Sequence, residues 1–187
     1  MKPLKLRPAL IALALVGAAG VALAGCSTFS RGPVGNRAVP QPAKAVDLER
    51  YSGLWYEIAR YEFSFERGCE AVTAEYRLLE NGGVEVINSC RKGSPTGPIK
   101  VAKGRAKVVP DSANAKLKVS FFGPFFGDYW VLDHADDYAW SIVGEPSGRN
   151  LWLLSRSARP EPAMREAIDN RVRELGYDTS LIRETQH

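Results

Sequence analysis

"SGLWYEIAR", residues 52–60, begins on a glycine and a tryptophan and then mixes an acid, an arginine and further aromatic side chains. A strand buried on both faces is more uniformly apolar, and a strand facing only water does not start on tryptophan. Because side chains alternate between the two faces of a strand, the mixture indicates one face that lines an interior and one that meets solvent. By alternation from Trp55, the inward residues are Glu57, Ala59 and Tyr61.

The sequence after this strand reads as a succession of short strands separated by turn residues. Asn81-Gly82-Gly83 stands between two alternating segments, which is a strong hairpin signal. This order of strands predicts an all-β protein, an eight-stranded antiparallel up-and-down β-barrel, because closure removes exposed edges. A β-sandwich is the alternative, and a barrel of this size can hold one small ligand. The predicted strands are 55–61, 72–79, 84–90, 99–109, 116–122, 128–133, 138–143 and 150–156.

A single helix is predicted after the strands, over 160–175. Met164, Ile168, Val172 and Leu175 form one apolar stripe, and Gly176 follows as a C-terminal stop. We therefore expect one C-terminal α-helix packed on the outside of the barrel. The tail at 177–182 either adds a short strand or lies against the body.

The N-terminal segment 1–25 reads as an export signal, with a basic start and the apolar run 9–24. Leu23-Ala24-Gly25-Cys26 looks like a bacterial lipobox, which predicts a lipoprotein signal peptide and a lipidated Cys26. An ordinary secretory signal is the alternative. Residues 26–46, rich in glycine and proline, are predicted to be the lipidated cysteine and a flexible tether, and 47–187 the folded domain. By resemblance to bacterial lipoproteins, Ser27 favours the outer membrane.

The charge balance argues against nucleic-acid binding. The chain has 25 basic and 21 acidic residues, and three of the basic ones lie in the predicted signal, so 22 remain against 21. A nearly neutral body lacks the basic face that binds nucleic acid. With Cys26 acylated, Cys69 and Cys90 are left in an oxidising compartment and are predicted to form a disulfide. Two free buried thiols are the alternative.

The residues quoted above and their order resemble the lipocalins, and most closely bacterial outer-membrane lipocalins similar to apolipoprotein D. Gly-x-Trp at Gly53 and Trp55 matches the family's first motif, and Arg156 matches the arginine that ends the last strand. Gly127-Asp128-Tyr129 is nearest to the second motif but lacks its threonine. The resemblance covers 46–187 and rests on 51–60, 65–68, 117–125 and 151–156.

The resemblance implies structural roles for three residues. Gly53 lets the chain turn sharply into the barrel, and Trp55 closes one end of it. The Arg156 guanidinium is expected to stack on the Trp55 indole, a contact that contributes on the order of 1 kcal/mol.

Candidate ligand-binding residues follow from which strand faces point inward. Parity with Arg156 places Leu154 and Trp152 inside, and the small residues Ala102, Gly104 and Ala106 leave room on another wall. We interpret Arg60 and Glu57 as surface or barrel-end residues in preference to residues that bind a ligand head group. Glu57 is nevertheless kept as a candidate. The full candidate set is Glu57, Tyr61, Tyr76, Tyr138, Trp140 and Trp152.

The segment 121–126 holds four phenylalanines around Gly123-Pro124. We leave two interpretations open. It is a packed loop, or it is an apolar lip at the barrel mouth that contacts a membrane or a second subunit in a homodimer.

Enzymatic chemistry finds little support in the sequence. His134 lies in an acidic turn and is expected to be exposed, and His187 is the last residue. No catalytic residue, metal site or cofactor is predicted. The resemblance implies a membrane-anchored protein at the periplasmic face of the outer membrane that binds a fatty acid or lysophospholipid for lipid storage, transport or membrane maintenance. The alternatives are an interaction lipoprotein with a filled barrel and an isomerase-like enzyme with a free cavity thiol.

Overall fold

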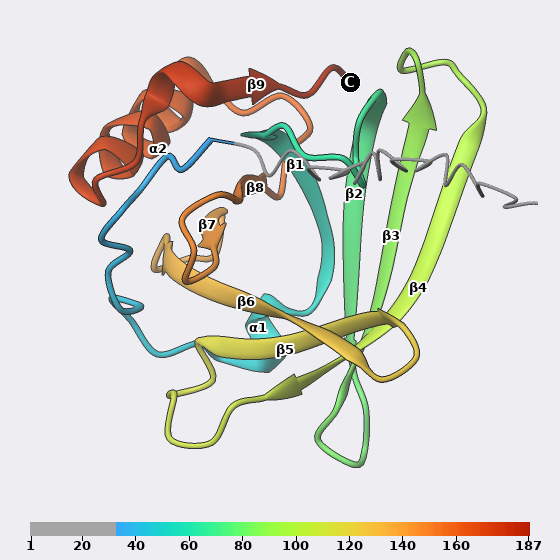
Figure 1. The fold of residues 1–187 in the computed structure, drawn as a ribbon, viewed down its shortest axis with the longest axis vertical. Helices are drawn as coiled ribbons and strands as arrows, with labels where there is room; N and C mark the ends of the chain where they lie inside the picture. The colour runs from blue at the N-terminus through green and yellow to red at the C-terminus, as the bar shows by residue number, and fades with distance from the viewer. Residues whose placement is uncertain (1–32) are drawn as a thin grey trace, which may run out of the picture. The chain divides into compact units, whose positions relative to one another are not determined.

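The computed structural model describes residues 33–187. Within this range eight antiparallel strands close into a barrel, with a helix on its outer wall (Figure 1). Each strand pairs with its neighbour in sequence, and β1 pairs with both β2 and β8, which closes the sheet. The predicted barrel is thus confirmed. Its strands are β1 (Gly53–Tyr61), β2 (Cys69–Leu78), β3 (Val84–Lys92), β4 (Ile99–Val108), β5 (Lys116–Phe122), β6 (Phe125–His134), β7 (Trp140–Gly144) and β8 (Leu151–Ser155).

The two ends of the barrel differ. A short helix, α1 (Leu48–Tyr51), lies before β1 at the closed end. The open end carries the connections 62–68, 93–98, 123–124 and 145–150. One of these differs from expectation, because residues 123–127 were left between the predicted strands 116–122 and 128–133. β5 and β6 instead continue to a tight turn, which Gly123 makes with a φ of 55°.

The motif residues pack together beneath α1. Gly53 has a φ of 90°, a conformation that side chains with a Cβ rarely adopt, and Trp55 is fully buried. The Arg156 guanidinium lies 3.8 Å from the centroid of the Trp55 ring. It also donates hydrogen bonds of 2.7–3.2 Å to the carbonyl oxygens of Arg50, Tyr51, Ser52 and Leu54. This arginine therefore ties the end of the barrel to the chain entering it.

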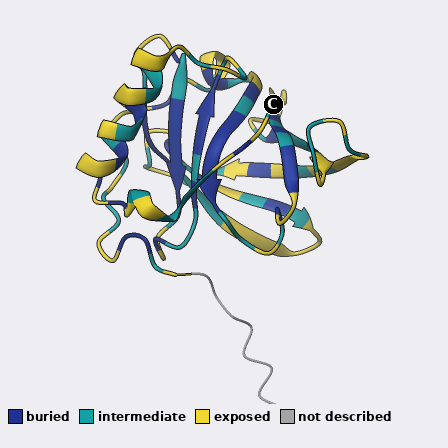
Figure 2. Ribbon diagram, turned by 90° about the horizontal axis from the view of Figure 1, so that it is seen from above, coloured by how far each residue is buried: buried dark blue, intermediate teal, exposed yellow. Residues whose placement is uncertain are grey.

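The C-terminal helix α2 (Pro162–Glu174) packs on the outside of the barrel through the predicted apolar stripe, with Ile168 and Val172 fully buried. Figure 2 shows the rest of this helix as largely exposed. The tail continues through a single 3-10 turn, η1 (Thr179–Leu181), into a short strand, β9 (Ile182–Glu184), which pairs with β1. The tail therefore extends the sheet at one edge of β1.

Residues 33–46 were expected to be part of a flexible tether, but they pack along the barrel. The backbone N–H groups of Gly35 and Asn36 both donate to the carbonyl oxygen of Gly148, at 2.9 and 3.1 Å. Further along, Ala43 N–H donates to the Leu132 carbonyl at 2.9 Å, and Val46 is buried in the core. The predicted signal peptide and Cys26 lie outside the described residues.

The predicted disulfide is confirmed. Cys69 at the start of β2 is bonded to Cys90 near the end of β3, with Cα atoms 5.4 Å apart. It clamps two neighbouring strands at the open end of the barrel, which stiffens the rim of that end.

Candidate ligand-binding site

The barrel encloses a cavity of about 320 Å³. Its surface is mainly apolar, and Ala102, Gly104 and Ala106, which were expected to form a small-residue wall, are not among its lining residues. Ligand pockets in proteins have volumes of about 300–1,000 Å³, so the cavity suits one small apolar molecule. Its apolar wall includes Val72, Ala74, Val86, Val119, Phe121 and Leu154.

The inner end of the cavity is floored by a chain of hydroxyl groups. The Tyr76 and Tyr129 hydroxyls lie 2.8 Å apart, and the Tyr51 hydroxyl lies 3.0 Å from both Tyr129 and Ser141. Burial raises the pKa of Tyr51 to about 12, and burial also raises the pKa of Tyr76 and of Tyr129 well above the usual value for tyrosine. The floor is therefore uncharged at physiological pH, and its hydroxyl groups satisfy one another.

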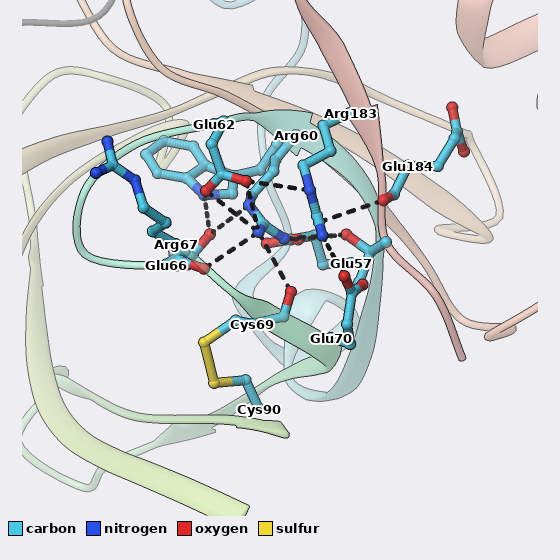
Figure 3. A network of polar contacts seen from close by, with 12 residues as sticks. Glu57, Arg60, Glu62, Glu66, Arg67, Cys69, Glu70, Cys90, Arg183 and Glu184 are labelled. Carbon is cyan, nitrogen blue, oxygen red and sulfur yellow. Dashed lines mark hydrogen bonds and ion pairs between the residues drawn. A yellow bond between two sulfur atoms is a disulfide. The ribbon is translucent and has the colours of Figure 1, made fainter. Parts of the chain in front are cut away.

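One wall of the cavity contains buried charges, centred on Arg60 (Figure 3). Arg60 is 0% exposed, and its Nη1 donates to Glu57 Oε1 at 2.7 Å. Its Nε lies 3.6 Å from Glu66 Oε2, and its Nη2 also donates to the carbonyl oxygens of Glu66 and Cys69. Glu57 and Glu66 line the cavity, whereas Arg60 lies behind them. The acids thus face the cavity and the cation faces the protein.

The C-terminal tail completes this wall. Thr185 Oγ1 donates to Glu57 Oε1 at 2.6 Å, and its N–H donates to the Ile58 carbonyl. Arg183 forms an ion pair with Glu70, whose other carboxylate oxygen accepts from Gln186 N–H. The buried acids are therefore held by partners from distant parts of the chain.

Burial raises the pKa of the Glu66 carboxyl well above its ordinary value of 4.5, and the Glu57 carboxylate raises it further. A protonated Glu66 is retained in the fold at pH values where the unfolded chain has released the proton. Stability should then fall as pH rises above about 4.5.

Glu66→Gln keeps the neutral shape of the protonated acid and cannot ionise. We expect its stability advantage over the wild type to be small near pH 4.5 and to grow as pH rises to about 8. Urea unfolding across this pH range measures the difference. Parallel pH profiles for the two proteins would show that Glu66 ionises freely in the fold.

Aromatic side chains surround the mouth of the cavity. Phe63 packs edge-on against Trp152 with ring centroids 5.5 Å apart, and Phe65 lies 6.1 Å from both Phe121 and Phe122. Trp152 Nε1 donates to Glu66 Oε2 at 3.3 Å. The mouth is therefore apolar, with the acidic wall directly beneath it.

Three of the six candidate residues, Glu57, Tyr76 and Trp152, line the cavity. Leu154 does as well, as its parity with Arg156 predicted. Tyr61 does not, and the inward assignment of Ala59 and Tyr61 is wrong. A bulge between Glu57 and Ala59 reverses the alternation of β1. Tyr61 instead packs in the outer core cluster, and its hydroxyl donates to the Asp178 carbonyl at 2.8 Å.

Tyr138 and Trp140 were expected to share an inward face but lie elsewhere. Tyr138 has a φ of 62° in the turn before β7 and stacks on His134 at 4.3 Å at the closed end. Trp140 packs on the outer side of the barrel, in the cluster that includes Ile168 of α2. His134 was expected to be exposed, but it is buried because its ring nitrogens contact the carbonyls of Ala45 and Ala135.

Most of the other lining residues were not anticipated, among them Phe63, Phe65, Glu66 and Tyr129. Tyr129 alternates with the buried Val131 on β6, a signal that the sequence offered. The other three stand in the connection after β1, where strand alternation no longer applies.

The sequence-family model described as a lipocalin-like domain matches residues 46–187 of this chain. The chain belongs to the lipocalin family. Lipocalins bind small hydrophobic ligands, and those related to this chain are non-enzymatic binding proteins, which accords with an apolar cavity inside an eight-stranded barrel.

Several individual relatives support the lipocalin assignment. Outer membrane lipoprotein Blc of Vibrio cholerae is 39% identical over 158 residues, which cover 84% of this chain and 92% of that protein. Blc of Escherichia coli K12 is 38% identical, covering 75% and 82%. Apolipoprotein D of Mus musculus is 40% identical over 121 residues, which cover 62% of this chain and 61% of that protein. The fold resembles insecticyanin of Manduca sexta, with a TM-score of 0.66, 24% identity, and coverage of 81% of this lipocalin and 87% of insecticyanin.

Two further observations concern the described part of this lipocalin. No helix within residues 33–187 is both long and apolar enough to span a bilayer. In the same range, no three histidine, cysteine, aspartate or glutamate side chains are grouped so that they could hold a metal ion.

Proposed function

We propose that the protein is a membrane-anchored lipid carrier that holds the acyl chain of one fatty acid or lysophospholipid in its barrel. The observation that carries this proposal is the open apolar cavity, because a barrel filled by its own side chains would leave no such space. Burial of an acyl chain would contribute about 25 cal/mol for each Å² of apolar surface removed from water. Binding is non-covalent.

The charges around the cavity favour one orientation of the ligand. The acidic and basic side chains that line it are Glu57, Glu66 and Asp128, so none of them carries positive charge. A carboxylate or phosphate head group deep inside would therefore be repelled or left without a partner. Exposed cations stand at the mouth, including Lys100, whose Nζ lies 4.8 Å from the Phe65 ring centroid. The acyl chain thus enters first, and the head group stays at the mouth.

Cys26 and the two Blc relatives named above, which are outer membrane lipoproteins, support the anchor. Acyl chains on Cys26 would hold the protein at the periplasmic face of the outer membrane. A carrier fixed there suits storage, transport or maintenance of membrane lipids.

Trp152→Glu and Trp140→Glu form a matched pair that tests the cavity. Trp152 lines the cavity and Trp140 does not. A carboxylate in the apolar cavity beside Glu66 is expected to weaken binding about tenfold or more, a loss of about 1.4 kcal/mol. Trp140→Glu should bind as the wild type does.

Titration with a fluorescent fatty acid measures the affinity of both variants, and melting curves confirm that each is folded. If both variants are folded and bind the fatty acid with equal affinity, the assignment of this cavity as the ligand site is wrong.

A further inference from the structure

The turn between β5 and β6 exposes large apolar side chains at the open end. We call Phe122, Gly123, Pro124 and Phe125 the β5–β6 tip. Phe122 is 66% exposed and Phe125 is 78% exposed. Exposed aromatic side chains of this size on a tight turn, next to a ligand mouth, are typical of an interaction surface.

Basic side chains surround the β5–β6 tip. Arg105 Nη2 donates to the Gly123 carbonyl at 3.5 Å, and the Arg105 and Lys107 cations lie 5.7 and 5.6 Å from the Phe126 ring centroid. Lys100, Lys92 and Arg67 are exposed around the other side of the mouth.

The acids near this surface are already engaged. Asp128 pairs with Lys118 at 2.7 Å, Glu85 lies 3.5 Å from Arg77, and Glu66 is buried. The open end therefore combines apolar side chains with unbalanced positive charge. An anionic phospholipid surface has the complementary chemistry, with an apolar interior beneath a layer of phosphates.

The path of the chain supports the same orientation. Gly35 is bonded to Gly148 in the connection between β7 and β8, at the open end. Cys26 stands nine residues before Gly35, so its acyl chains lie at most about 30 Å from this point. The nine residues of β1 rise about 30 Å along the strand, and a tilt of about 35–45° reduces this to about 21–25 Å along the barrel axis. The connection therefore reaches a membrane at the open end with little extension, whereas a membrane at the closed end would require most of its length.

We propose that the open end of the barrel docks on an anionic phospholipid bilayer with the β5–β6 tip inserted. The inference rests on the proposed function through the Cys26 anchor. A lipid chain then passes between the bilayer and the cavity without crossing water. A second copy of the chain is a poorer occupant of this surface, because two open ends facing each other would bring their basic rims together.

Full-length lipoprotein in vesicles tests the docking. The vesicles contain phosphatidylethanolamine with a minority of phosphatidylglycerol and carry acyl chains brominated along their length. Phe125→Trp reports on the β5–β6 tip. Leu79→Trp is the matched control, because Leu79 is 42% exposed and follows β2 at the closed end. The wild type has four tryptophans, so the emission of the added tryptophan is obtained by subtracting the wild-type spectrum from that of the variant.

We expect blue-shifted emission from Phe125→Trp with most of it quenched by the brominated chains, and water-like, unquenched emission from Leu79→Trp. If the protein floats with the vesicles but the tryptophan at position 125 has water-like emission, the docking is overturned and the anchor is unaffected. Failure to float overturns both. A third outcome is a blue shift that depends on protein concentration and is not accompanied by quenching. It would mean that the β5–β6 tip contacts a second copy of the chain, and it also overturns the proposal. Lipid affinity, measured separately, tests the carrier function independently.

Discussion

Replacing Arg60 with methionine is expected to destabilise the protein by about 3–5 kcal/mol, because the change leaves the buried Glu57 carboxylate without its cation. Methionine has a similar length but cannot donate to Glu57 or to the carbonyl oxygens of Glu66 and Cys69. Urea unfolding at neutral pH measures the loss.

Arg77→Met provides the control for this prediction. Arg77 also contacts two carboxylates, Glu75 at 2.9 Å and Glu85 at 3.5 Å, but its side chain is exposed. Its loss should cost at most about 1 kcal/mol. If Arg60→Met were as mild as Arg77→Met, the wall of buried charge would not contribute to the stability of the barrel.

Replacing Ala74 with tryptophan is expected to reduce lipid affinity about 100-fold, a loss of about 2.7 kcal/mol. Ala74 is on β2 and lines the cavity, so an indole there occupies the space proposed for the acyl chain. Titration with a fluorescent fatty acid measures the effect.

Glu75→Trp is the matched control, because Glu75 is the next residue along β2 and pairs with Arg77 on the solvent side. It should bind lipid as the wild type does. Unchanged affinity in a folded Ala74→Trp variant would mean that lipid binds elsewhere.

Much of the fold could be predicted from the sequence because local signals agree with it. Alternation along 72–79 and the turn at Asn81-Gly82-Gly83 define the hairpin of β2 and β3. Turn residues separate the other strands, and the stripe on 160–175 marks the helix that packs outside. Closure into a barrel follows, because open edges would expose unpaired backbone groups.

The candidate site could be predicted only in part, because its wall depends on a long-range contact. β9 pairs with β1 just beyond the bulge, with Ala59 opposite Glu184, and Thr185 donates to the Ile58 carbonyl. The bulge reverses the alternation, so Tyr61 turns away from the cavity. Nothing within residues 52–61 signals that the C-terminal tail will pair there.

The buried position of Arg60 was missed for a related reason. A charged residue is expected at the surface unless it is paired. The partners of Arg60 include Glu66, which lies in the connection after β1, so no strand pattern places the two together. Residues 33–46 were also misjudged, because their composition is typical of a linker while their backbone pairs with Gly148 and Leu132.

Native mass spectrometry of the protein purified from bacteria, with extraction of whatever it retains, tests the carrier function most directly. We predict that the wild type carries one fatty acid or lysophospholipid and that Ala74→Trp carries none. An empty wild type that also fails to take up a fluorescent fatty acid would contradict the carrier function and favour an interaction lipoprotein.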